Sequence, residues 1–111
     1  MWTRQRGTST WDRANGAATD GEGNIYVAGT TTGSLDGNIN VDPGGGDLVL
    51  IKFDGMGDWQ WTRQTGGAGG QWANGVAVDG VGNIYAVGAS TSAMYSQSYL
   101  VVKYDSAGNR I

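Results

Sequence analysis

Short apolar runs separated by polar, glycine-rich segments make up most of the chain. The runs are about four to seven residues long and end in Gly, Asp or Asn, which favours strands over helices. A nearly unbroken apolar run predicts a strand buried on both faces, and a run that alternates predicts a half-buried one. The pattern therefore predicts an all-β protein with strands at residues 2–5, 16–19, 25–30, 48–53, 59–64, 76–78, 84–89 and 99–104.

The chain contains one unit written twice. DGEGNIYVAG at residues 20–29 recurs as DGVGNIYAVG at 79–88, 59 positions later, and WTRQ at 2–5 recurs with the same shift. The segment LIKFD, which starts at Leu50, recurs as VVKYD from Val101 at a shift of 51, so the second copy is 8 residues shorter in one loop. A period of this length indicates a repeat architecture.

A turn motif, Asp-x-x-Gly-(Asn/Asp), occurs four times, beginning at Asp20, Asp54, Asp79 and Asp105. The Asp side chain accepts backbone N–H bonds within such a turn, and the Gly adopts the positive φ that a short hairpin link requires. Four such turns predict four hairpins. Four antiparallel strands joined by short turns form the blade of a β-propeller, and the small side chains of residues 16–19 suit its crowded axis.

The linked motifs GxAxDxxGNIY and K(F/Y)DxxG, with WTRQ and LDGN between them, resemble the bacterial seven-bladed β-propeller repeat family over nearly the whole chain. This resemblance implies two four-stranded antiparallel blades, blade one at residues 16–64 and blade two at residues 75–111. It also implies an extracellular or cell-surface location and carries no family-wide catalytic residues.

Two blades are too few to close a ring of about four to eight blades. The second copy ends at Ile111 before a fourth strand, and the strand that would complete it is the one predicted at residues 2–5. We therefore expect a head-to-tail cyclic homo-oligomer in which this strand completes blade two of a neighbouring chain. A trimer would have six blades and a tetramer eight. An isolated pair of blades would expose an apolar face and a strand edge.

The composition of the chain limits the kinds of partner that it is expected to bind. The formal charge is -3 and the seven Lys and Arg residues are scattered, so no basic face for nucleic acid is predicted. Cysteine is absent, which excludes disulfides. No apolar stretch is long enough to cross a bilayer, and the first residues lack the apolar core of a signal peptide, so no membrane insertion is expected.

One loop has the spacing of metal ligands. Asp36, Asn38, Asn40 and Asp42 alternate, and Asp47 follows Asp36 by eleven positions, as oxygen ligands do in a calcium loop. A valine stands where an EF-hand loop needs glycine, and no Glu closes the loop. The alternative is that LDGN, which is part of the repeat pattern, forms a structural turn. We expect no cofactor, with calcium at these five residues as the candidate.

The remaining candidates are aromatic and basic. Trp11 and Trp72 are predicted to lie in loops joining the blades, where exposed indoles stack on sugar rings or anchor a protein partner. The alternative is that each covers its own blade core. Arg4 and Arg63 are equivalent in the repeat, and each is expected to form an inter-blade bond to a turn carboxylate, such as Asp12 or Asp58; the alternative is that they bind an anion.

Catalytic motifs are missing. The chain has no histidine, no cysteine, no nucleophile elbow and no phosphate-binding loop. The sequence thus predicts a non-enzymatic propeller module for binding or scaffolding that assembles into a ring. A lectin-like, carbohydrate-binding propeller is the alternative, and a glycosidase-type hydrolase with two carboxylates at the ring mouth is a weaker one.

Overall fold

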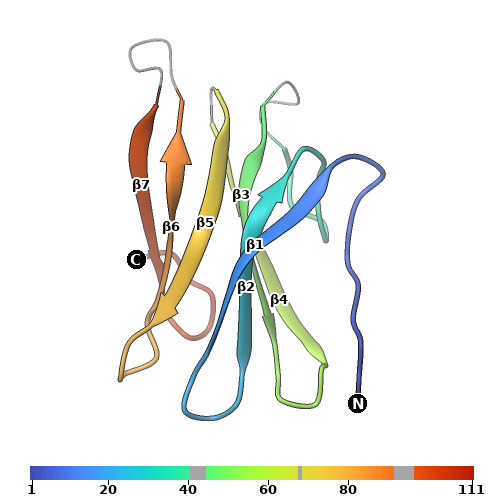
Figure 1. Ribbon diagram of the computed structural model, residues 1–111, viewed down its shortest axis with the longest axis vertical. Coiled ribbons are helices and arrows are strands. Elements are labelled where there is room, and N and C mark those ends of the chain that lie inside the picture. Colours follow the sequence, from blue (N-terminus) through green and yellow to red (C-terminus); the bar gives the residue numbers. More distant parts are fainter. Residues whose placement is uncertain (41–44, 68, 92–96) are drawn as a thin grey trace.

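The computed structural model describes residues 1–40, 45–67, 69–91 and 97–111, which form two antiparallel sheets (Figure 1). Blade one contains, in spatial order, β1 (Asp12–Thr19), β2 (Ile25–Thr31), β3 (Asp47–Phe53) and β4 (Trp59–Thr65). Blade two contains β5 (Gln71–Val78), β6 (Ile84–Ser90) and β7 (Ser98–Tyr104). Within the described ranges, no helix is long and apolar enough to cross a membrane.

Seven of the eight predicted strands are present, with small differences at their ends. The first strand of each blade begins four or five residues earlier than predicted, at Asp12 and at Gln71. These extra residues pair with β2 and β6 across a bulge, which period-two patterning does not reveal. The loop placement of Trp72 was therefore wrong, because this residue lies within β5, whereas Trp11 does precede β1.

All four turns have the predicted geometry. In the first, the N–H of Gly23 donates to the carbonyl of Asp20 at 3.2 Å, and Gly23 has a φ of 84°. The equivalent glycines of the other turns also have positive φ and donate to the matching Asp carbonyl. The fourth turn leads to an isolated antiparallel bridge between Tyr104 and Arg110, at the place where β4 begins in blade one.

β1 and β5, the first strands of the two blades, lie side by side. A Cβ atom added at Gly16 would stand 3.0 Å from the Cα atom of Gly75, and the side chain of Asn15 donates to the carbonyl of Ala73 at 2.7 Å. This close approach confirms that small residues are needed where the blades meet at the inner edge. The blades thus diverge outward from β1 and β5, as Figure 1 shows.

The core lies between the blades. Its members are fully or almost fully buried side chains from both sheets: Tyr26, Ala28, Leu48 and Leu50 of blade one, and Ala73, Ile84, Ala86, Val102 and Tyr104 of blade two. Trp61 of β4 packs against this cluster. Since each sheet contributes one face, a blade obtains its core from its neighbour rather than from itself.

Residues 2–5 are not paired as a strand in this single chain, whereas the sequence predicts that they form one with a neighbouring copy. A strand needs a partner that accepts and donates backbone hydrogen bonds. Within one chain, Figure 1 places the N-terminal segment and β7, the predicted partner strand, at opposite sides of the molecule. The segment instead packs against blade one through its side chains.

Candidate functional site

The two tryptophans singled out from the sequence line one hollow of about 470 Å³. It lies where the first strands of the two blades meet. Trp11 directly precedes β1, Arg13 and Asn15 belong to β1, and Trp72 and Asn74 come from β5. The remaining lining residues are Thr30, Thr32, Gly46 and Gly70. Sequence reasoning identified both indoles but missed Arg13 and the asparagines, because only the pairing of the blades brings them together.

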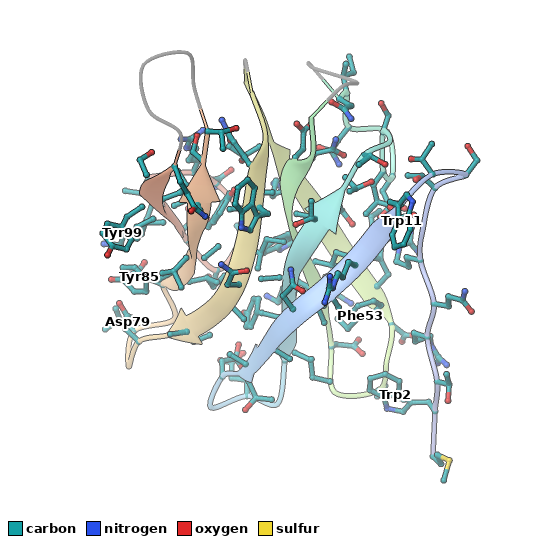
Figure 2. The ribbon with its side chains drawn as sticks, turned by 45° about the horizontal axis from the view of Figure 1, so that its top comes forward. Trp2, Trp11, Phe53, Asp79, Tyr85 and Tyr99 are labelled. Atoms are coloured by element: carbon teal, nitrogen blue, oxygen red, sulfur yellow. The ribbon has the colours of Figure 1, made fainter. Side chains whose placement is uncertain are left out.

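Hydrogen bonds at the rim fix the position of Trp11. The backbone N–H of Thr32 donates to the carbonyl of Trp11 at 2.9 Å, which extends the pairing of β1 with β2, and the N–H of Trp11 donates to the hydroxyl of Thr32 at 3.0 Å. The neighbouring Asp12 accepts bonds from the backbone and hydroxyl of Thr8 and from the hydroxyl of Thr31. Figure 2 shows Trp11 at the start of β1, and 79% of its surface is exposed. A hydrogen-bonded rim therefore presents an open indole.

The hollow contains a cation without a counterion. The guanidinium of Arg13 has no hydrogen bond or ion pair within the described parts of the chain, and none of the lining residues is acidic. Asn15 is partly engaged, since its amide N–H group donates to Ala73, whereas the side chain of Asn74 is exposed. The hollow therefore combines apolar ring faces, amide groups and one positive charge.

The loop proposed for calcium is largely engaged in protein contacts. Asp36 and Gly37 have φ values of 51° and 84°, and the N–H of Asn38 donates to the carbonyl of Leu35 at 3.0 Å, so this part of the loop is a tight turn. The Asp36 carboxylate accepts from Arg6 and from the hydroxyl of Thr62. Arg6 in particular lowers the pKa of Asp36, despite an opposing effect of burial.

The other calcium candidates are placed as follows. The side chain of Asn40 donates to the carbonyl of Thr32 at 2.7 Å. Asp47 is fully buried at the start of β3 and accepts from Gln64 at 2.8 Å. Asp42 lies outside the described residues. Within those that are described, no three acidic, histidine or cysteine side chains gather as metal ligands do.

Two equivalent arginines tie outer segments to turns. Arg63 of β4 donates from Nε to the carbonyl of Gly108 in the last turn of blade two, at 2.7 Å, and its guanidinium lies 5.0 Å from the ring centre of Trp61. Arg4 donates in the same way to the carbonyl of Gly57 at 2.8 Å. The acceptor is therefore a turn carbonyl. The expectation of a carboxylate partner, Asp12 or Asp58, was wrong: neither arginine forms an ion pair among the described residues, and Asp12 is bonded by Thr8 and Thr31 instead.

The tryptophans beside these arginines repeat the arrangement. The ring of Trp2, beside the turn between β3 and β4 in Figure 2, lies 5.5 Å from the guanidinium of Arg4, and a Cβ atom at Gly57 would clash with that ring. A Cβ atom at Gly108 would likewise clash with the ring of Trp61. The N-terminal segment thus contacts blade one as β4 contacts blade two, although only β4 is paired as a strand.

A comparison with known families agrees with this geometry. The SBBP family, described as a beta-propeller repeat, matches the chain twice, at residues 2–36 and 60–94, which together are more than half of its length. The chain belongs to the SBBP beta-propeller repeat family. Each match begins at the outer WTRQ segment and continues into the first two strands of the following blade. No curated protein matches the chain.

Proposed function

We propose that this SBBP chain is a non-enzymatic binding and scaffold module that functions as a closed ring of several copies. Six blades from three copies or eight from four would close such a ring. The ring exposes the hollow between β1 and β5 once per chain, so any ligand is bound at several symmetry-related places. Such repetition raises the overall affinity for a partner that carries several copies of its recognised group.

One observation carries the ring proposal: residues 2–4 contact blade one as residues 61–63 contact blade two. The two arginines donate to equivalent turn carbonyls, and the two tryptophans cover equivalent glycines. In the second case the contacting segment is the fourth strand of the preceding blade. The N-terminal segment therefore occupies the place of an outer strand whose own blade precedes blade one.

The mass of the 111-residue chain in solution tests the ring. We expect multi-angle light scattering to give a single species of three or four chains. Deletion of residues 1–5 should yield a monomer or an aggregate, because the edge of β7 would then lack its partner. A matched control replaces Thr3 by Ser, which keeps the arginine and tryptophan contacts and should leave the mass unchanged. A monodisperse wild-type monomer would rule out the ring.

The hollow favours a second function, the binding of carbohydrate. Indole rings stack on the apolar faces of sugars, and amide groups supply donors and acceptors for hydroxyls. Trp11 and Trp72 line one hollow with Asn15 and Asn74, whose side-chain oxygens accept no hydrogen bond within the described residues. The unpaired guanidinium of Arg13 favours a sugar with a carboxylate, which it can bind through two parallel hydrogen bonds.

A glycan array tests this function, with uronic acids and sialic acids expected among the bound sugars. Trp72→Ala should lower the affinity about tenfold or more, which is about 1.4 kcal/mol. Arg13→Gln keeps a polar side chain of similar reach, so it should weaken acidic sugars and spare neutral ones. The exposed Gln60→Ala, outside the hollow, serves as the control. An array without any bound glycan would eliminate this candidate and leave the scaffold function standing.

A further inference from the structure

The junction between the two blades of one chain is an example of how one blade packs on the next. We propose that the same junction, residue for residue, forms between blade two of one copy and blade one of the neighbouring copy. This inference rests on the proposed ring and specifies its register. Each residue of blade one has an equivalent in blade two, 59 positions later before the long loop and 51 positions later after it. Replacing both partners of a contact inside the chain by their equivalents therefore gives the corresponding contact between copies.

The unpaired face of blade two has the character of a buried face. Leu48 and Leu50 of blade one are fully buried against blade two, whereas their equivalents, Tyr99 and Val101, are 100% and 65% exposed. Val87, equivalent to the buried Ala28, is 41% exposed. Figure 2 shows Tyr99 projecting from blade two away from blade one. This apolar face therefore lacks the neighbour that its counterpart in blade one has.

The face of blade one that lacks a neighbour is complementary to it. A hollow of about 240 Å³ opens there, lined by Val27, Val49, Ile51 and Phe53 together with the N-terminal arginines. The equivalents of these four residues in blade two are Ala86, Leu100, Val102 and Tyr104. Three of those four are buried and Leu100 is half-buried, all packed in the core between the blades. The occupant we infer is thus a second copy of the same chain, presenting Tyr99 and Val101.

A polar contact completes the inner edge. Asn15 donates to the carbonyl of Ala73 inside the chain, at 2.7 Å. The equivalent pair is Asn74 and Ala14, which are both exposed, whereas Ala73 is fully buried. In the ring the side chain of Asn74 donates to the carbonyl of Ala14 in the neighbouring copy. This bond is the intermolecular counterpart of one that already exists within the chain.

The strand register follows from β3 and β4. Leu50 lies opposite Arg63, and their equivalents are Val101 and Arg4. We therefore place Val101 of β7 opposite Arg4 of the neighbouring copy. Moving two residues along the strand puts Tyr99 opposite Arg6. A shift of a single residue would bring Thr3 and Gln5 to the side now taken by Trp2 and Arg4, so the contacts of those two residues with Gly57 disfavour it.

Engineered disulfides test this register, because the chain has no cysteine of its own. A chain with Arg4→Cys is mixed with a chain with Val101→Cys and oxidised. We expect a covalent dimer on non-reducing gels, since directly opposite Cα atoms lie within the span of a disulfide. The control mixes Arg4→Cys with Tyr99→Cys, a diagonal pair about 7–8 Å apart, which should link poorly or not at all.

A second pair of cysteines tests the same register without removing the contact that Arg4 makes. Gln5→Cys and Leu100→Cys occupy the next position of the same register and leave Arg4 intact. If both pairs fail while the wild-type chain is trimeric or tetrameric, or if the diagonal pair links preferentially, the register is wrong but the ring remains. If the wild-type chain is a monomer, the proposed ring fails first. Covalent dimers from the matched pairs alone support the inference.

Discussion

The aspartates that open the turns act as local anchors. Asp20 accepts backbone bonds from Glu22 and Asn24 and side-chain bonds from Asn24 and Tyr26, all between 2.8 and 3.0 Å. Burial opposes ionisation, but these bonds together lower the pKa of the Asp20 carboxyl to about 2. Asp79 has the same set of donors, and its pKa is also about 2.

Acid should therefore destabilise the fold in a defined range. A carboxyl with a folded-state pKa of about 2 and an ordinary pKa of 3.8 stabilises the protein above about pH 4. This contribution decreases as the pH falls from about 4 to about 2, because the unfolded chain takes up protons first. We expect the urea midpoint to fall over this range, and chemical denaturation followed by tryptophan fluorescence measures it.

The substitutions Asp20→Asn and Asp79→Asn check the cause. Each places an amide N–H group opposite groups that themselves donate, so stability at neutral pH should fall. The double variant should also lose much of the decline between pH 4 and pH 2. Glu22→Gln removes a carboxylate with no hydrogen bond in the described parts of the chain, and should retain the decline. An unchanged slope in the double variant would contradict the anchoring role.

At the scale of the strands, two glycines allow β1 and β5 to bulge against their partners. A Cβ atom added at Gly29 would overlap the carbonyl of Arg13, and one at Gly88 would overlap the carbonyl of Trp72. Both contacts lie next to the bulges of the inner strands. The backbones approach there because the first strand of each blade bends along the inner edge.

Replacement of Gly29 by Ala should consequently destabilise the protein. The clash is with backbone, which no side-chain rotation relieves, so we expect a loss of about 1–3 kcal/mol or more in the free energy of unfolding. Gly21→Ala is the matched control, since its added Cβ atom would meet no atom within 4 Å. Urea titration distinguishes the two. Equal midpoints for both variants would show that the inner strand relaxes around the added methyl group.

At the scale of the whole molecule, the two equivalent asparagines separate folding from assembly. Asn15→Ala removes a bond inside the chain and should lower the stability of the dissociated chain by about 1 kcal/mol. Asn74→Ala removes no side-chain hydrogen bond among the described residues of one chain, so it should raise only the concentration needed for assembly. Light scattering on dilution measures the concentration needed for assembly, and urea unfolding of the dissociated chain measures its stability. If Asn15→Ala and Asn74→Ala lowered the stability of the dissociated chain equally, the two asparagines would not separate folding from assembly.

Much of the architecture was predictable from local signals. The Asp-x-x-Gly turns depend on residues within five positions, and the apolar runs identify the strands between them, so both could be read along the chain. The bulges could not be predicted from local sequence, because Gly29 is constrained by the backbone of β1, which lies earlier in the chain. The hollow was found only in part, since Arg13 and Asn74 carry no local signal of their shared position.

By itself the sequence determined the repeat, the turns and the strand order, because short-range hydrogen bonds and backbone freedom specify these features. Tertiary structure decided what the repeat means for packing. It placed Trp11 at one hollow with Arg13, Trp72 and Asn74. It also set residues 2–4 against blade one in the way that β4 is set against blade two. Such contacts join segments distant in the chain, and only the packing of one sheet on another brings them within reach.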